Sequence, residues 1–418
     1  MRPTDVNPSA GSNWKLYEYL VNVTIAFQGE HPIKLAQAEI HEIIIEKDYD
    51  NLPIPVFIMR LMIPQTLADK IWANDPDVTV RMDIYEKLEG ADTDQERVTK
   101  RMYFNDVFKV IRSNNDPTYN VTLRKRIRNM AGIRDEDLTI DDLGGIFNFI
   151  LVKKNCLYDS KTISNMILTQ VNLTTALKVL FRDAKCKNVL MSNLDNSTVF
   201  DELLILPMTF LSNVICLENQ YGFHKEGTQV FMDFDTFYIL RMNGKATAWK
   251  RMEPKRGVFC ISETGNSGVT SNGGYSTSTE VIMNVDVRQY TSPTSEPVVD
   301  NLSGANTLLL NEYQNQYSDV KTDIGVIYDV KSTQGHNPYV ESQIQTRKME
   351  LTKTRELFCV SIDISALTPN KEYRMVSDVT SLTQELSGTY RLSKVLTTFI
   401  KEGTKFTGVS SITLKGTA

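Results

Sequence analysis

The stretch that decides the fold runs from Leu203 to Leu240 and reads LLILPMTFLSNVICLENQYGFHKEGTQVFMDFDTFYIL. An apolar strand ends at Pro207, and a short helix follows whose apolar residues share one face: Phe210, Val214, Leu217 and Tyr221. Thr209 is a suitable helix cap, and Gly222 stands where helices commonly end. After a turn at residues 224–227, the aromatic and β-branched residues of Gln229–Leu240 predict a β-hairpin. The unit has the character of a packing module, with no catalytic pattern.

Composition places the chain among large proteins with ordinary apolar content. Its 418 residues suggest about two to four domains, and a chain of this size buries a core without disulfides. The net charge of −5 argues against a dedicated nucleic-acid binder, which normally carries a basic domain. No apolar run is long enough for a signal peptide or a bilayer-spanning helix, so we expect synthesis in a reducing cytoplasm.

The first part of the chain predicts an antiparallel β-domain over residues 15–125, preceded by a flexible arm at 1–14. Period-two alternation, or a short continuous apolar run, marks strands at 15–27, 35–47, 55–63, 78–88 and 101–111. Pro64 opens one crossing helix that reaches Asn74, with Leu67, Ile71 and Trp72 on one side.

The rest of the chain predicts an α+β insertion, a flexible linker and a second antiparallel β-domain. The insertion covers residues 126–245 and includes helical periodicity over Lys161–Lys185, which the polar segments TQVN and LTT divide in two. The linker covers 246–279, with the Gly/Ser-rich segment Gly265–Ser278. The second β-domain covers 280–418, with strands at 280–290, 323–330, 349–364 and 373–376. It ends in a hairpin, Gly388–Lys415, that turns at Lys401–Lys405.

Residues with metal or catalytic chemistry are scattered. No zinc spacing joins the histidines, which stand at 31, 41, 224 and 336. No CxxC pair joins the cysteines, for which we expect free thiols: Cys156, Cys186, Cys216, Cys260 and Cys359. No nucleophile elbow or phosphate-binding loop is present. We therefore predict no catalytic residue, no cofactor and no metal.

Three charged patterns favour structural interpretations. Asp233 and Asp235 share one strand face and could hold a cation, but further oxygen ligands are missing nearby, which favours a solvated strand end. The acidic run at 135–142 lacks the glycine and terminal glutamate of a calcium loop. The basic cluster at 124–128 is typical of a salt-bridged domain junction, with an acidic partner surface or nucleic acid as the alternatives.

Two segments and their order give the chain a family resemblance. ENQYGFHKEGTQVFMDFDTFYIL (218–240) and the closing hairpin with YRLSKV (390–395) follow a strand-rich domain that contains the helix IPQTLADKIW (63–72). The whole resembles baseplate hub proteins of tailed bacteriophages. That resemblance implies two β-domains like tail-tube subunits, separated by an insertion, in a homotrimer that joins a threefold spike to a sixfold tube and seeds tube assembly.

The resemblance also implies partners and a location. The expected partners are the tail tube, the central spike, the tape measure and the baseplate wedge, in a virion tail through whose lumen DNA passes without sequence-specific binding. A peripheral wedge or fibre-attachment protein is the alternative, distinguished by six or more copies off the tail axis. A peptidoglycan hydrolase is the remote alternative, and it would need a paired-carboxylate or Cys/His site that the sequence lacks.

Overall fold

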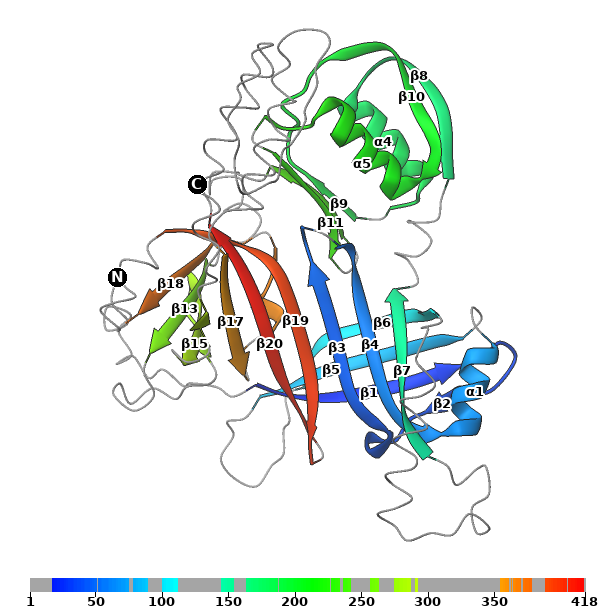
Figure 1. Cartoon of the computed structure of the whole chain (residues 1–418), viewed down its shortest axis with the longest axis vertical. Coiled ribbons are helices and arrows are strands. Elements are labelled where there is room, and N and C mark those ends of the chain that lie inside the picture. The colour runs from blue at the N-terminus through cyan, green and yellow to red at the C-terminus, as the bar shows by residue number, and fades with distance from the viewer. Residues whose placement is uncertain are drawn as a thin grey trace, which may run out of the picture.

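The protein is mainly β with three α-helices in the residues described, which confirms the predicted fold class. The computed structural model describes residues 17–50, 52–74, 78–88, 100–111, 144–153, 163–186, 188–225, 227–233, 236–241, 256–262, 274–286, 290–291, 354–360, 362, 364–369, 371–377, 388–403 and 405–416. These residues form two adjoining β-modules with an α/β unit beyond one end of them (Figure 1).

The first module is a closed antiparallel barrel. Its strands are β1 (Tyr17–Ala26), β3 (Ile40–Asp48), β4 (Leu52–Pro64), β5 (Thr79–Leu88), β6 (Lys100–Ile111), β7 (Gly144–Lys153), β19 (Tyr390–Glu402) and β20 (Lys405–Gly416). They pair in the order β19-β3-β4-β7-β6-β5-β1-β20, and β20 pairs back to β19. A short strand, β2 (Ile33–Lys34), pairs with the end of β1. The C-terminal hairpin thus completes a barrel begun at the N-terminus.

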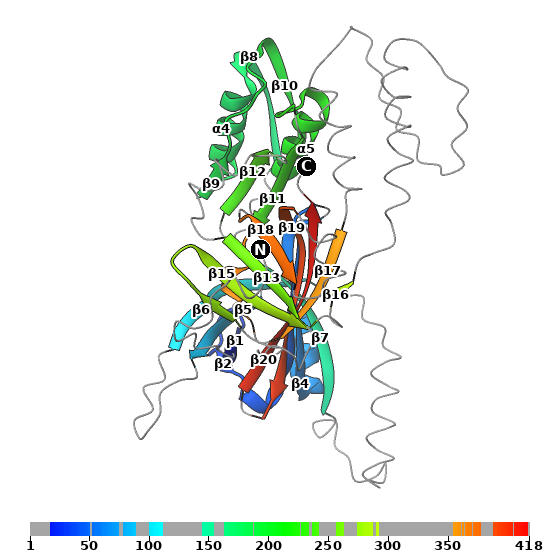
Figure 2. The same cartoon turned by 90° about the vertical axis from the view of Figure 1, so that its left-hand side faces the viewer.

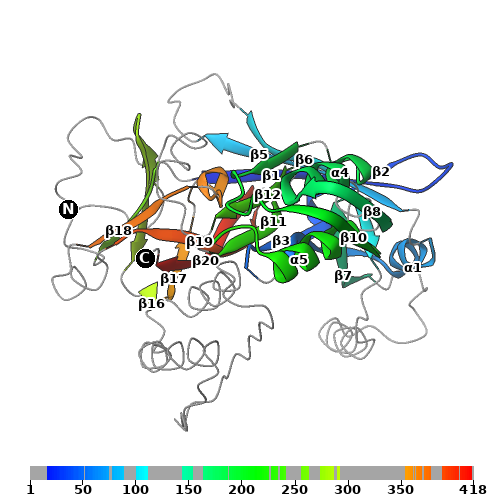
Figure 3. The ribbon, with the colours of Figure 1, turned by 90° about the horizontal axis from the view of Figure 1, so that it is seen from above.

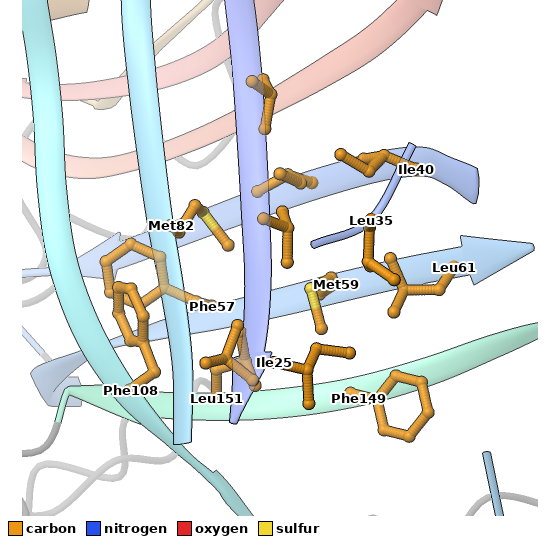
Figure 4. Packing of buried hydrophobic residues seen from close by; sticks show 14 of the residues in the cluster. Ile25, Leu35, Ile40, Phe57, Met59, Leu61, Met82, Phe108, Phe149 and Leu151 are labelled. Atoms are coloured by element: carbon orange, nitrogen blue, oxygen red, sulfur yellow. The ribbon is translucent and has the colours of Figure 1, made fainter. Parts of the chain in front are cut away.

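Alternation explains the core of this barrel. Every second residue of its strands points inward, so that one set of apolar side chains fills the interior (Figure 4). Phe57 and Phe108 meet there with ring centroids 4.6 Å apart. At one end lies α1 (Gln65–Ala73), which begins after Pro64 as predicted and has Asn74, its predicted last residue, as its C-terminal cap. Trp72 of α1 contacts the rings of two β7 phenylalanines.

The second module shares the hairpin with the first. Its other strands are β13 (Arg256–Ser262), β14 (Gly274–Ser276), β15 (Glu280–Asp286), β16 (Tyr290–Thr291), β17 (Thr354–Val360) and β18 (Tyr373–Ser377). β17 pairs with β20, and β18 pairs with β19 (Figure 2). Contrary to the expected antiparallel sheet, β13 runs parallel to both β15 and β18. At Gly257 a Cβ atom would lie 2.4 Å from the Tyr373 ring, so this close pairing requires glycine.

The insertion packs two helices against a two-stranded and a three-stranded sheet. It contains β8 (Ile163–Asn172), α4 (Leu173–Asp183), β9 (Asn188–Met191), β10 (Val199–Thr209), α5 (Phe210–Tyr221), β11 (Thr228–Asp233) and β12 (Thr236–Arg241). Thr209 caps α5, and Gly222 ends it with φ of 66°. The predicted apolar face of α5 packs into a core that this helix shares with α4 and the strands of the insertion. Figure 3 shows these elements lying over the first barrel.

Several predicted boundaries differ from the structure. Ile163–Asn172 is a strand, not the first half of a helix, because it pairs along β10 and only α4 follows the helical pattern. β10 continues past Pro207 to Thr209 across a register shift. β7 lies in the range expected for the insertion but pairs with β4 and β6 of the barrel. β13 and β14 lie in the range that was expected to be a flexible linker. They are strands instead, because their β-branched and aromatic residues pair with the second module.

Some predictions concern residues outside the described part of the chain. These are the arm at 1–14, the strand at 323–330, the basic cluster at 124–128 and the acidic run at 135–142. Among the described helices, none combines the length and apolar character that crossing a bilayer would need.

Candidate functional site

The closing hairpin joins the two modules. It turns at Gly403, whose φ of 65° suits glycine, and the prediction of a hairpin over Gly388–Lys415 is confirmed. The half near the turn belongs to the first barrel, where Phe399 pairs opposite Ile43. The open half belongs to the second module, where Leu414 pairs opposite Arg355. Two long strands that serve both sheets make the modules one mechanical unit.

A buried charge junction lies beside the open half of this hairpin. Asp50 follows β3, and its side chain is 1% exposed. Arg391 donates to its Oδ1 atom over 2.7 Å, Lys415 Nζ lies 2.8 Å from Oδ2, and Gln229 Nε2 donates to Oδ1 over 3.0 Å. Ser393 also donates to this carboxylate. The junction therefore ties together the β3–β4 turn, the hairpin and β11 of the insertion.

The charges of the junction hold Asp50 ionised. Burial by itself would raise the pKa of Asp50, but the Arg391 and Lys415 cations outweigh it and hold that pKa well below its usual range. Removing one member of such a cluster leaves buried charge uncompensated, which is strongly unfavourable. The junction fixes the position of the insertion relative to both modules.

A second ion pair reinforces the same contact. Lys47 Nζ lies 2.7 Å from Asp233 Oδ1, and both side chains are buried. Tyr49 donates to the other Asp233 oxygen over 3.4 Å, and its ring contacts Phe231 of β11. Asp233 is therefore a buried ion-pair partner, not the solvated strand end that we expected. Asp235 lies outside the described residues, and no cluster of metal-ligating side chains occurs among those described.

The described part of the insertion contains a polar cluster that no sequence motif predicts. His224 Nε2 lies 3.0 Å from Ser192 Oγ, and His224 Nδ1 lies 3.7 Å from Asp195 Oδ2. Asp195 also pairs with Arg241. The order Ser–His–Asp resembles a hydrolase triad, but these residues are separated by loops and strands, and only their tertiary contact could identify them.

The geometry of this cluster favours a structural role. The His224 side chain is fully buried, and 3.7 Å is too long for the hydrogen bond that would orient the ring. Ser192 Oγ accepts the N–H of Arg241 over 3.2 Å, which ties the hydroxyl to β12. Burial lowers the pKa of His224 to about 4, an effect that Asp195 opposes and Arg241 strengthens. A neutral, enclosed imidazole holds the turn after α5 against β9 and β12.

The remaining predicted residues do not converge. His31 and His41 are exposed, and neither belongs to the insertion that contains the cluster. Cys260 and Cys359 are buried thiols outside any disulfide, as predicted, and burial raises the pKa of Cys359. Cys186 and Cys216 are partly exposed and also lie outside any disulfide. Cys156 and His336 lie outside the described residues.

Comparisons with known proteins point to bacteriophages. A family profile described as Bacteriophage PBS1 gene 109 protein matches residues 15–417. No match was found among curated protein sequences. Similar solved structures include a tail protein from Neisseria meningitidis MC58, with 10% identity, 95% of this chain and 96% of that chain covered, and a TM-score of 0.45.

Two further structures have the same kind of distant likeness. A 43 kDa tail protein of prophage MuSo2 from Shewanella oneidensis has 11% identity, coverage of 94% and 97%, and a TM-score of 0.45. The E. coli c3393 protein, a type VI secretion component described as similar to T4 tail proteins gp27 and gp5, has 6% identity, coverage of 94% and 77%, and a TM-score of 0.41. Because these scores are low, the family assignment rests on the profile match.

Proposed function

The chain belongs to the family of the bacteriophage PBS1 gene 109 protein, and from this we propose that it is a structural protein of a phage tail. Within the tail we assign it to the central hub of the baseplate, where it joins a threefold spike to the sixfold tube and seeds assembly of that tube. Its partners there would be the tube, the spike, the tape measure and the wedge proteins. Its location would be the virion, after synthesis in the host cytoplasm.

The observation that carries this proposal is the pair of β-modules held side by side by one hairpin. Three copies of a chain with two such modules would supply six modules to a ring, which matches a threefold partner on one side and a sixfold partner on the other. The buried junction at Asp50 supports the same function, since it keeps the modules and the insertion in a fixed arrangement under load. The second module contains parallel pairings that the first lacks, so the two modules differ in strand topology and the ring would alternate two kinds of module.

Copy number and position in isolated tails test the proposal. We expect three copies on the tail axis, measured by quantitative mass spectrometry of purified tails and by a density map of the baseplate. Six or more copies away from the axis would reject the hub assignment in favour of a wedge or fibre-attachment protein. Degradation of peptidoglycan by the purified chain would reject a purely structural role.

A further inference from the structure

Strands β8 and β10 form a two-stranded ribbon in the insertion. Its inner face packs on α4 and α5 through Val171, Leu203 and Ile205, and Figure 1 shows the ribbon curving around the outside of these helices. Within the described residues each of the two strands pairs only with the other. The ribbon therefore has two edges, and an edge strand presents backbone N–H and C=O groups to which a further strand can bond.

β10 has the features that protect an edge strand from unwanted pairing. Its register against β8 shifts between Ile205 and Met208, where Pro207 supplies no backbone N–H. The buried Asn213 of α5 donates to the carbonyls of Leu206 and Met208 over 3.0 and 3.1 Å, which fixes this bulge. Bulges and prolines are devices by which natural proteins prevent edge-to-edge association. The free edge of β10 is therefore a poor site for a further strand.

β8 has none of these features. Over Ile163–Asn172 it contains no charged residue, no proline and no glycine. Its outward side chains include Ile163, 68% exposed, and Ile167, 64% exposed, the two most exposed large apolar side chains among those described. Leu204, directly opposite Ile167 on β10, is 52% exposed and continues this apolar surface. A long, apolar and uncharged edge strand invites pairing with another chain, and natural proteins rarely leave one bare.

We propose that the free edge of β8 binds an extended segment of a different tail protein, which adds a third strand to the ribbon. In strand addition the main chains are joined by hydrogen bonds, while alternate side chains determine which segment binds. The 10 residues of β8 span about 34 Å at a rise of about 3.4 Å per residue, which is enough for a full-length strand. The inference rests on the proposed function, since the partner is another protein of the tail.

The exposed side chains of the ribbon specify the chemistry of that segment. Residues opposite Ile163 and Ile167 would extend the apolar surface and should themselves be apolar or β-branched. Glu202 lies opposite Thr169, is exposed, and forms no ion pair with any residue that the structure describes. A residue of the added strand opposite Thr169 would lie about 10 Å from Glu202, two strand spacings, which a lysine or arginine side chain can bridge. We therefore expect a segment of alternating apolar residues with one cation.

A second copy of this chain does not fit as the partner. Pairing of β8 with β8 uses the same edge on both chains, so it closes after two copies and cannot unite three around one axis. It would also bring no cation to Glu202, because β8 is uncharged. A chain of different sequence meets both requirements.

Charge insertion on each strand tests the inference with the full chain. Ile167→Lys places a cation beside the added strand, and Leu204→Lys, the matched control, places one on the same face but one strand farther away. In cells that produce wild-type and variant chains in equal amounts, mass spectrometry of purified tails should find Ile167→Lys depleted about 30-fold, the factor for a central interface residue. Leu204→Lys should enter tails like the wild type, and both variants should keep the wild-type circular dichroism spectrum. Equal incorporation of the two variants, or equal depletion, would overturn the inference.

Hydrogen exchange tests the backbone contact in the unaltered chain. The amides of β8 should exchange at least about tenfold more slowly in assembled tails than in the isolated chain, while those of β10 keep their rates. Unchanged exchange in β8 would overturn the proposal. Equal slowing in both strands would do the same, because it would show a partner packed on the face of the ribbon.

Photo-crosslinking in assembled tails identifies the partner. Thr169→p-benzoylphenylalanine should form an adduct with another tail protein, at a segment with the alternation and the cation described above. No adduct, or an adduct of two copies at twice the 47.5 kDa of one chain, would overturn the proposal. The expected adduct in tails where the protein lies off the axis would keep the β8 site and reject only the hub assignment.

Discussion

Replacing Asp50 by Asn should destabilise the protein far more than breaking an exposed ion pair on the same hairpin. Asn has nearly the same volume as Asp but removes the carboxylate that Arg391 and Lys415 share. The matched control is Glu46→Gln, which removes the partner of Lys394, three residues from Arg391 on β19. Both changes therefore act between the β3 region and the hairpin, and they differ mainly in burial.

The burial of the partners sets the expected magnitudes. The side chains of Arg391 and Lys415 are 3% and 10% exposed, so Asp50→Asn leaves two buried cations without a counter-charge. Breaking a buried pair in this way costs about 3–5 kcal/mol, and we expect about 3 kcal/mol because the Asn oxygen still accepts hydrogen bonds. Lys394 and Glu46 are 38% and 30% exposed, and an exposed pair contributes at most about 1 kcal/mol.

Urea unfolding followed by circular dichroism measures the difference in the free energy of unfolding. The pKa of Asp50 is depressed, so its stabilising contribution is fully present above its unfolded pKa and is lost only as the pH falls toward the folded value. The effect of Asp50→Asn should therefore stay constant between pH 5 and pH 8. A loss no larger than that of Glu46→Gln, or one that varies across this range, would refute the role given to the junction.

Three further changes probe other parts of the fold. Burial raises the pKa of Glu218 from 4.5 to about 7, so the wild-type protein loses stability as the pH rises between these values. The free energy of unfolding of Glu218→Gln, measured with urea, should therefore rise relative to that of the wild type by up to about 3 kcal/mol between pH 4.5 and pH 7. A pH-independent difference would contradict this. Gly408→Val should cost about 1–3 kcal/mol, because a Cβ atom there would lie 2.6 Å from the Ile364 side chain, and thermal melting measures the loss. Phe399→Asp and Phe406→Asp bury an unpaired charge in the first barrel and should abolish folding and assembly; a wild-type circular dichroism spectrum would show the hairpin to be dispensable.

Some elements could be predicted because their signals are local. The α5 helix has its cap, its apolar stripe and its terminating glycine within a few residues, and all three lie where the pattern placed them. The closing hairpin has a glycine at its turn and alternating strands on both sides. β8 was predicted wrongly because its apolar residues satisfy a helical period, and its pairing with β10 prevailed over that local preference.

Tertiary structure alone decided how these elements combine. Local pattern cannot show that β7 closes the first barrel, that β13 runs parallel to its neighbours, or that one hairpin serves two modules. Nor could it bring Asp50 to Arg391, which lies 341 residues away along the chain. Periodicity and capping depend on neighbours within one or two turns of the backbone, so the sequence determined the elements and their apolar faces. Sheet order and buried ion pairs depend on which surfaces meet when the whole chain excludes water, and that is a property of the folded molecule.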